Sequence, residues 1–428
     1  METRTLEVLR CPYCGGRLEL VRTLFHRATD ERIDDGILGC HCCVFPVVNG
    51  IPVLHLQPGA VDARGHTERG EPERALRSMV GLEADGQASA FEAAIESERS
   101  TYQDIVEALG PGFEGGYFLY RFSDPTFVVA DAVVRSVAGK VLGGTRRAVD
   151  VCGGSGHLTR SLLALSTPPP VLADLYFAKV WLARRFTAPG CEAVCCDGNA
   201  PLPFARGAFG FAMCSDAFQY IWTKRQFIGE MLRLVNADGR GRDRAAAPEE
   251  APGAVVINHA HNQLTWSPSH GQPLSPAGYA DLFEGIAPRI FPEARLFADV
   301  IDRGVVDLSQ QDPPEALDDD PALTIVASGH PHVFERHRLD SLTPVQAEGE
   351  LRLNPLYAVR QDRRTLHLRL QFPSPEYEDE YGACRRYLPE EAVVSAGALE
   401  ALARGVAEPD VAELVRRRVI VRLPKQYY

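Results

Sequence analysis

Short apolar runs alternate with longer amphipathic stretches along the middle of the chain. The short runs predict strands, which occupy residues 147–152, 170–174, 192–197, 209–217, 253–260, 295–301 and 322–328. The stretches between them carry apolar residues at helical spacing and predict helices at 157–165, 177–186, 224–235 and 276–286. Because strands and helices alternate, we expect an α/β fold with a largely parallel sheet and right-handed crossovers.

The pattern changes on both sides of this region. Residues 1–58 end in the apolar run 45–56, and residues 59–90 are polar and rich in Gly and Glu. Residues 333–428 mix strand patterns at 366–372 and 415–423 with a helical pattern at 391–406. A charged Ala/Pro/Gly stretch at 239–253 predicts a surface insertion. The predicted parts are an N-terminal unit at 1–58, a linker with room for one helix at 59–90, the α/β domain at 91–332 and a C-terminal α+β extension at 333–428.

Charge and hydropathy exclude some function classes. The 428 residues include 45 Lys plus Arg and 57 Asp plus Glu, a net charge of −12, which disfavours a nucleic-acid partner. The sequence has no apolar run of about 18 residues and no secretory leader at its start, so we expect a cytoplasmic protein without a membrane partner. In that compartment cysteines stay reduced, and closely spaced pairs point to metal before disulfide.

Five of the 11 cysteines lie in the first 58 residues. Cys11-Pro-Tyr-Cys14 is one knuckle, and Cys40-His-Cys-Cys43 is the second. Two such knuckles fit one tetrahedral structural Zn²⁺. We predict Cys11, Cys14, Cys40 and Cys43 as its ligands. Cys43 is chosen because two intervening residues let both sulfurs reach one ion, and Cys42 and His41 remain alternatives.

Residues 9–56, from "LRCPYCGG" to "GIPVLHL", resemble a family of short zinc ribbons that includes the small activator subunit of tRNA and protein methyltransferases. The shared pattern is a leucine with Cys-x-x-Cys, a second cysteine pair, an aromatic-Pro and a Gly-Ile-Pro-Val-Leu tail. The spacing between Cys43 and Phe45 is shorter than is usual in that family. The resemblance implies a zinc ribbon over residues 1–58.

A glycine-rich turn follows the first predicted strand of the α/β region. "AVDVCGGSGHL" places Asp150 near the strand end and then Gly153, Gly154 and Gly156, where a backbone can approach a ligand closely. Carboxylates end the next two strands. Asp174 is placed to accept hydrogen bonds from both hydroxyls of a ribose, and Asp197 to accept one from an adenine amino group.

"VDVCGGSGHL", "ADLYFAKVW", "CCDGNAPLPF", "FGFAMCSDAFQYI" and "FIGEMLRLVNADG" together resemble the successive motifs of class I S-adenosylmethionine-dependent methyltransferases. Two positions depart from them: Cys152 stands for a glycine and Gly210 for an acidic residue. The resemblance implies a doubly wound Rossmann-like sheet with S-adenosyl-L-methionine as cofactor. The cofactor-binding residues that we predict are Asp150, Gly153, Gly154, Gly156, Asp174, Leu175, Asp197, Gly198, Asn199, Ser215, Tyr120 and Arg121.

Three residues are candidates for the chemistry. His259 and His261 lie at the end of the fifth strand, where ligands bind in this fold, and a continuing strand would point both the same way. Either could be a general base or hydrogen-bond donor; a structural role, or a metal site that also includes His270, is the alternative. Asp216 could act as a base or cap the helix after it. Tyr120 and Arg121 precede the first strand, where many of the resembled enzymes carry a lid.

These features predict an S-adenosylmethionine-dependent methyltransferase that acts on a small-molecule acceptor of biosynthesis. One alternative is an RNA methyltransferase, because some rRNA methyltransferases carry an N-terminal zinc ribbon. Residues 1–60 are not basic, however, with six arginines and seven acids. A second alternative is a non-catalytic scaffold with a degenerate cofactor site. The sequence is compatible with a homodimer but does not decide the oligomeric state.

Overall fold

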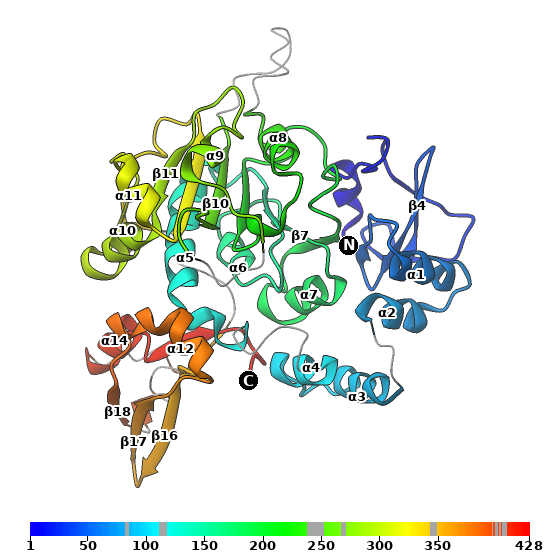
Figure 1. Cartoon of the computed structure of the whole chain (residues 1–428). Helices are drawn as coiled ribbons and strands as arrows, with labels where there is room; N and C mark the ends of the chain where they lie inside the picture. The colour runs from blue at the N-terminus through cyan, green and yellow to red at the C-terminus, as the bar shows by residue number, and fades with distance from the viewer. Residues whose placement is uncertain are drawn as a thin grey trace.

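The computed structural model describes residues 1–81, 85–110, 118–237, 252–266, 271–342, 349–395, 397–398, 401, 404 and 409–428. Most of the predicted insertion at 239–253, and His270, lie outside these residues. Figure 1 shows a central sheet with helices around it, the N-terminal residues at one edge and the C-terminal extension below. Within the described parts of the chain, no helix is long and apolar enough to cross a membrane.

The central sheet has seven strands in the order β11-β13-β10-β9-β6-β7-β8. Their bounds are β6 Ala148–Val151, β7 Val171–Asp174, β8 Glu192–Cys195, β9 Phe211–Ser215, β10 Ala254–His261, β11 Arg289–Pro292 and β13 Ala322–Ser328. All pairs are parallel except those of β13, which runs antiparallel to β10 and β11. The chain starts at β6 in the middle and winds first to β8 and then back through β9. This confirms the predicted α/β, doubly wound sheet.

Helices cover both faces of this sheet (Figure 1). They are α5 Pro125–Val141, α6 Thr159–Leu162, α7 Phe177–Leu182, α8 Lys224–Leu234, α9 Pro276–Ala280, α10 Glu293–Ala298 and α11 Pro314–Asp319. Helix α5 begins where the Asp124 side chain accepts a hydrogen bond from Phe127 N at 2.6 Å. Val133 of α5 shares one core with Met213, and Met231 of α8 shares the other core with Ala212. The predicted strand at 295–301 is wrong: it is helix α10 and its π-helical continuation, Asp299–Arg303.

The N-terminal unit is a small antiparallel sheet. It contains β1 Glu19–Leu20, β2 Arg27–Ala28, β3 Ile33–Gly39, β4 Val44–Val48 and β5 Ile51–Pro52. Its last residues continue beside the edge of the central sheet, where Val53 forms a parallel bridge with Cys195 of β8. Leu54 N donates to Cys195 O at 2.7 Å. The N-terminal sheet is therefore docked against β8 through backbone pairing.

The segment predicted as a linker is helical. It contains α1 Pro58–Glu68 and α2 Pro72–Val80, and α3 Asp85–Glu96 begins within it; α4 Tyr102–Leu109 follows. Ala60, Ala63 and Ala75 are buried at 2% exposure or less. These small side chains let α1 and α2 pack closely against the N-terminal sheet and against each other. The buried side of the two helices was not recognised in the sequence because the segment is rich in Gly and Glu.

The C-terminal extension is α+β, but one of its elements differs from the prediction. Strand β14 Arg336–Arg338 pairs with β12 Val305–Asp307, which belongs to the preceding α/β region. The other strands of the extension are β15 Glu350–Leu353 with β19 Ile420–Leu423, and the sheet β16 Tyr357–Asp362, β17 Thr365–Leu370, β18 Glu391–Ser395. The helices are α12 Pro375–Tyr381 and α14 Pro409–Arg416. Strand β18 opens the stretch 391–406 that was predicted as helical, because Val393 and Val394 pair with β17.

Candidate functional site

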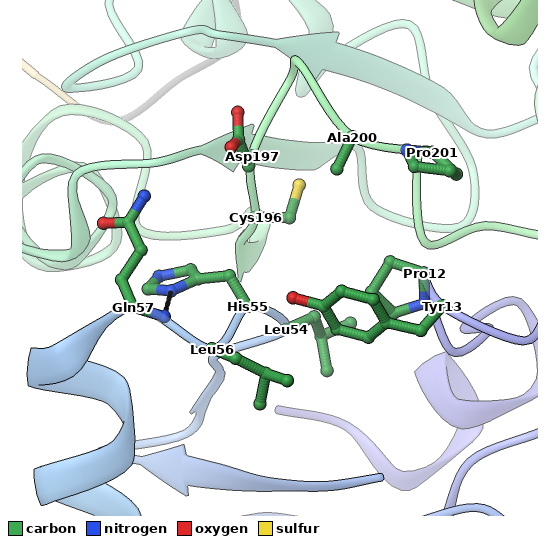
Figure 2. A pocket seen from close by; sticks show the side chains of 10 residues that line it. All are labelled: Pro12, Tyr13, Leu54, His55, Leu56, Gln57, Cys196, Asp197, Ala200 and Pro201. Atoms are coloured by element: carbon green, nitrogen blue, oxygen red, sulfur yellow. Dashed lines mark hydrogen bonds between the residues drawn. The ribbon is translucent and has the colours of Figure 1, made fainter. Parts of the chain in front are cut away.

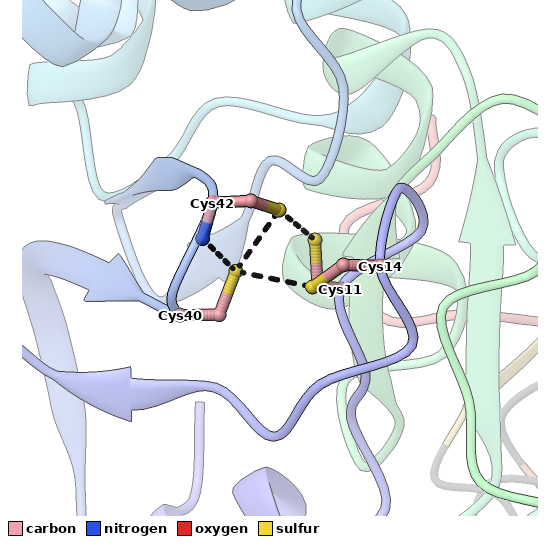
Figure 3. Close-up of side chains that lie close together, drawn as sticks. All are labelled: Cys11, Cys14, Cys40 and Cys42. Carbon is pink, nitrogen blue, oxygen red and sulfur yellow. Dashed lines mark hydrogen bonds between the residues drawn. The ribbon is translucent and has the colours of Figure 1, made fainter.

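Four cysteine sulfurs converge in the N-terminal sheet (Figure 3). They belong to Cys11, Cys14, Cys40 and Cys42, and all lie within 4.8 Å of one another. The Sγ of Cys42 is 3.7 Å from that of Cys11 and 3.6 Å from that of Cys40, and the Cys14 and Cys40 sulfurs are 3.7 Å apart. Sulfurs about 2.3 Å from one tetrahedral zinc ion lie about 3.8 Å apart. The cluster therefore fits a structural Zn²⁺ held by four thiolates.

The fourth sulfur is that of Cys42, which corrects the predicted choice of Cys43. The sulfur of Cys43 lies 3.4 Å from that of Cys42 but does not belong to the group. Cys40 N donates to Cys43 O at 3.0 Å, and this tight turn aims Cys42 at the other sulfurs. His41 is exposed and is not a member of the group. The second knuckle thus has one intervening residue rather than two.

The glycine-rich turn lies between β6 and α6, at the carboxyl edge of the sheet. Cys152, Gly154 and Gly156 have φ values of 60°, 54° and 74°, in the region that favours glycine. A Cβ on Gly153 would clash with the carboxyl group of Asp150 and with Leu172. This turn therefore requires glycine at 153, and it forms a cradle at the point where the chain reverses its winding direction. Ligands bind at such points in doubly wound sheets.

Asp150 lies beneath this turn and is 1% exposed. Its Oδ2 accepts a hydrogen bond from Thr159 Oγ1 at 2.6 Å, while its Oδ1 is buried with no hydrogen-bond partner in the described part of the chain. Burial raises the pKa of this carboxyl group to about 7, although the bond from Thr159 acts in the opposite direction. A buried, unpartnered carboxylate oxygen is costly, and a bound ligand that donates to it would remove that cost.

Two more unpartnered polar side chains lie on the same face of the sheet. Asn258 is fully buried, and within the described ranges neither its Oδ1 nor its Nδ2 has a hydrogen-bond partner; the buried Oγ of Ser215 also lacks one there. Asn258 and Ser215 are neighbours in the β9–β10 register, and Asp150 pairs with Met213 two residues before Ser215. Strand alternation therefore directs all three toward one face. Ser215 was predicted at the cofactor, and Asn258 was not.

Asp174 ends β7 next to the glycine-rich turn. Its two oxygens accept hydrogen bonds from Gly154 N and Tyr176 N, each at 2.9 Å. Burial raises the pKa of its carboxyl group, and these amide donors oppose that shift. A carboxylate has about four lone-pair sites, so two remain for the hydroxyls of a ribose. The adjacent carbonyl of Leu175 accepts from Cys195 Sγ at 3.2 Å, which ties this loop to β8.

Asp197 lines a cavity of about 180 Å³ after β8 (Figure 2). Its Oδ1 accepts from Asn199 N at 2.8 Å, and Asn199 Oδ1 in turn accepts from Trp222 N at 2.6 Å. Tyr13 and His55 of the N-terminal unit line the opposite wall in Figure 2. Asp197 was predicted to accept from adenine, but the contribution of the zinc-ribbon region to this cavity was not predicted.

Gly198 lies next to the glycine-rich turn. A Cβ at this position would lie 3.0 Å from Cys152 Sγ and 3.1 Å from Ile221 Cδ1. The loop after β8 therefore packs closely on the turn after β6, and only a glycine allows this approach without displacing a neighbour. The predicted cofactor-binding residues of β6, β7 and β8 thus lie along one continuous edge of the sheet.

The three candidates for the chemistry are brought together. One ligand-type atom from each of Asp216, His259 and His261 lies within 4.8 Å of the others. The Nε2 of His261 is 4.0 Å from Asp216 Oδ1, and the two imidazole ring centroids are 5.2 Å apart. The cluster lies at the carboxyl ends of β9 and β10, next to the edge that carries the predicted cofactor-binding residues. Asp216 does not cap a helix through its side chain, since η4 Phe218–Tyr220 has no side-chain cap.

Glu293 holds His259 in place and was not predicted. It accepts from His259 N at 2.8 Å and contacts His259 Nδ1 at 2.7 Å, and Thr324 Oγ1 donates to it at 3.0 Å. Burial alone would lower the pKa of His259, but the charges of Glu293 and Asp216 raise it to about 9. Burial, followed by the charge of His259, lowers the pKa of His261. The only sequence signal for Glu293 is an isolated acid after the apolar run 290–292.

Arg121 and Tyr120 approach the chemical cluster from the segment before α5. The guanidinium of Arg121 lies 3.1 Å from Asp216 Oδ2 and 3.3 Å from Asp124 Oδ2, and its Nη1 donates to Thr126 Oγ1 at 2.9 Å. Tyr120 packs edge-on against Tyr377 of α12, with centroids 5.6 Å apart. Arg121 therefore joins the acidic group around Asp216, and contact of either residue with a cofactor remains a prediction.

Comparison with known proteins gives one match in sequence and many in structure. No protein-family model matches the chain. UPF0434 protein BAV2101 from Bordetella avium (strain 197N) is 46% identical over 56 residues, which is 13% of this chain and 71% of that protein. This match covers the N-terminal cysteine region.

Three solved structures represent the structural matches. A chain of the complex between the Haloferax volcanii Trm112 methyltransferase activator and a candidate methyltransferase is 16% identical, with a TM-score of 0.33 over 47% of this chain and 89% of that chain. Geranyl diphosphate C-methyltransferase from Streptomyces coelicolor A3(2) is 14% identical, with a TM-score of 0.33 over 46% of this chain and 74% of that chain. An S-adenosylmethionine-dependent methyltransferase from Mesorhizobium loti is 15% identical, with a TM-score of 0.31 over 44% of this chain and 92% of that chain.

Proposed function

The chain belongs, through its N-terminal region, to the family of UPF0434 proteins, and we propose that it is an S-adenosylmethionine-dependent methyltransferase that acts on a small-molecule acceptor. The N-terminal region is proposed to be a zinc ribbon that supports the cofactor site in cis. Because thiolate zinc sites need reduced cysteines, we place the protein in the cytoplasm.

One observation carries the cofactor proposal. Among the residues that the structure describes, Asp150 Oδ1 is buried without a hydrogen-bond partner, beneath a turn in which a Cβ at position 153 would clash. It lies between Asp174 and the unpartnered side chains of Ser215 and Asn258, at the winding reversal of the sheet. Unpartnered acceptors and donors fit a ligand end that carries both an ammonium and a carboxylate group. Asp174 and the Asp197 cavity fit a ribose and an adenine farther along the same edge.

The chain's own groups would then orient two reactants. The glycine-rich turn, Asp150 and Asp174 would hold the cofactor, which would supply an electrophilic methyl group on a positively charged sulfur. For that chemistry alignment and proximity matter most, so the chain's own residues would mainly orient the acceptor toward the methyl group. The cluster of Asp216, His259 and His261 lies beside the cofactor edge and is proposed to hold the acceptor and receive its proton.

The charge distribution favours a small acceptor over RNA. The chain carries a net charge of −12, and the chemical cluster contains Asp216 and Glu293, with Asp124 nearby. A polyanion would have to approach these carboxylates, which is unfavourable. Within the cluster the side chains of His259 and His261 are only 18% and 11% exposed, so the acceptor must be small enough to enter a recessed site.

Isothermal titration of the zinc-loaded full chain with S-adenosylhomocysteine tests the cofactor proposal. We expect one ligand per chain, and about tenfold or greater weakening in Asp174→Ala, which loses hydrogen bonds to a charged acceptor. Asp340→Ala removes an exposed carboxylate from η6 Leu339–Ser341 and should bind as the wild type does. Absence of S-adenosylhomocysteine binding by the wild type, or unchanged binding by Asp174→Ala, would refute the cofactor proposal. Binding of RNA with a steep salt dependence would refute the proposal that the acceptor is a small molecule.

A further inference from the structure

We propose that Asp216, His259 and His261 form a second metal site, one that binds a divalent transition-metal ion. Their ligand-type atoms lie within 4.8 Å of one another at the carboxyl ends of β9 and β10. This group is separate in sequence from the cysteine cluster and differs from it in chemistry. Ligand atoms about 2.0–2.2 Å from one ion lie roughly 3–4 Å apart. The 4.0 Å between His261 Nε2 and Asp216 Oδ1 is at the upper end of that range.

The surroundings of His259 are those of a metal ligand. Its Nδ1 lies 2.7 Å from Glu293 Oε2, which fixes the ring and leaves Nε2 as the nitrogen for an ion. Histidine ligands commonly donate their other ring nitrogen to a carboxylate in this way. Glu293 is itself held by His259 N and Thr324 Oγ1. Glu293 is thus a positioning residue that orients His259.

The backbone at the site is bent to bring these side chains together. Asp216 and His259 have φ values of 54° and 53°, a region that non-glycine residues adopt infrequently. The register of β10 against β13 shifts between Ile257 and Ala260, which marks a bulge at His259. Asp216 N donates to Asn258 O at 3.0 Å and locks the two bends to each other. Backbone strain of this kind concentrates at functional sites.

The charge of the site also fits a divalent cation. Asp216 lies against Arg121, which also contacts Asp124, and Glu293 lies against His259. The carboxylate of Asp216 also lies 4.0 Å from His261 Nε2. A divalent ion between Asp216 and the two imidazoles would take the place of the imidazole proton as the counter-charge for these carboxylates, since metal binding releases the protons of its ligands. Buried charges of one sign persist only where a counter-charge is supplied.

The donor set selects the class of ion and the class of acceptor. Two imidazoles and one carboxylate favour first-row transition metals such as Mn²⁺, Fe²⁺, Co²⁺ or Zn²⁺ over Ca²⁺ or Mg²⁺, which prefer oxygen ligands. Three protein ligands leave coordination positions open. If the proposed methyl transfer is correct, on which this part rests, an acceptor oxygen binds there and loses its proton more readily. The acceptor would then be a hydroxyl compound able to chelate a metal.

Mn²⁺ is the probe for the test, because thiolates select softer ions and the cysteine cluster is kept filled with zinc. Electron paramagnetic resonance measures the free Mn²⁺ at each point of a titration of the full chain, and the bound Mn²⁺ is the total minus the free ion. We expect one Mn²⁺ per chain, at least tenfold weaker binding in Asp216→Asn and His261→Ala, and about 10–100-fold weaker binding in Glu293→Gln. His332→Ala removes an exposed histidine that follows the opposite end of β13, and should leave Mn²⁺ binding unchanged.

Two results would overturn the metal site: no Mn²⁺ bound by the wild type, or equal binding by Asp216→Asn and His261→Ala. Circular dichroism of each variant ensures that only folded protein is compared, and Asp216→Asn is nearly isosteric. S-adenosylhomocysteine titration of the same samples separates this inference from the proposed function. Ligand binding without Mn²⁺ binding refutes the metal site alone, and Mn²⁺ binding without ligand binding refutes the methyltransferase alone.

Discussion

The hydroxyl group of Tyr427 lies 2.7 Å from Nε2 of His157, which joins the C-terminal residues to the segment between the glycine-rich turn and α6. The same hydroxyl donates to Phe118 O at 3.0 Å, so its oxygen accepts the proton of His157 Nε2. Burial and nearby cations lower the pKa of His157 well below its usual range, which keeps the ring neutral. Tyr427 also stacks on Tyr102 of α4, with centroids 4.7 Å apart.

Tyr427→Phe should destabilise the protein by about 1–3 kcal/mol, because the buried N–H of His157 loses its acceptor. The ring and its stacking on Tyr102 are retained, so the effect isolates the hydroxyl group. Urea unfolding, with the midpoint and slope both fitted, measures it. Val359→Ala on the exposed part of β16 is the control for an unrelated truncation. An unchanged midpoint in Tyr427→Phe would show that the His157 contact is not needed.

Cys42→Ser should lose the zinc of the N-terminal cluster, and Cys43→Ser should keep it. The reason is that Cys42 Sγ lies among the other sulfurs, whereas Cys43 Sγ does not belong to the group. A mercurial thiol reagent releases thiolate-bound zinc, which a chromogenic chelator then quantifies. We expect about one ion per chain in the wild type and in Cys43→Ser, and close to none in Cys42→Ser. The reverse outcome would restore Cys43 as the ligand.

Asp150→Asn should make stability less dependent on pH. The folded-state pKa of Asp150 is raised to about 7 from an unfolded value of about 3.9. Its protonated form therefore contributes stability that is complete below about pH 4 and is lost as the pH rises through about 7. At pH 8 this loss is on the order of 2–4 kcal/mol, and Asp150→Asn avoids it.

Denaturant unfolding of wild type and Asp150→Asn from pH 5 to pH 8 measures this difference, with the exposed Asp319→Asn as control. The free energy of unfolding of the variant relative to the wild type should increase with pH. Its affinity for S-adenosylhomocysteine should fall, because the amide carries no negative charge and has one acceptor oxygen in place of two. A variant that gains stability but keeps full affinity would separate Asp150 from the cofactor.

Tyr13→Ala should weaken S-adenosylhomocysteine binding several-fold, although Tyr13 belongs to the zinc-ribbon region. Its ring lines the cavity that contains Asp197 and His55, as Figure 2 shows. Loss of an aromatic wall removes on the order of 1 kcal/mol of contact with a planar base. Isothermal titration gives the affinity, and Asp197→Ala provides the comparison from the core side. Equal affinities of Tyr13→Ala and wild type would place the adenine elsewhere.

The central sheet could be predicted because β6, β7 and β8 are fully buried runs, which leave a clear signal in the sequence. The prediction for residues 295–301 was wrong because their pattern fits two elements. Leu296 and Val300 are four residues apart, which fits a helix, but the short apolar run also fits a strand. Pro292 and Glu293 begin that helix. Short apolar runs of this kind are decided by tertiary packing.

The site residues show the same division. The position of Gly153 in the turn and that of Asp174 at a strand end could be predicted, because both depend on local sequence. Cys42 could not be chosen over Cys43, since the choice depends on the hydrogen bond that closes the Cys40 turn. Glu293 acts on a histidine 34 residues earlier, and no local pattern encodes such a contact.

The parallel bridge between Val53 and Cys195 has a consequence for solubility. Strand β8 is the last strand of the central sheet, and an unpaired edge strand is a template for self-association. The N-terminal region occupies part of this edge with its own backbone. Because it is tethered to the same polypeptide, its effective concentration at the edge does not depend on expression level. The protein therefore carries its own edge protection in fixed stoichiometry, which a separately encoded partner could not guarantee.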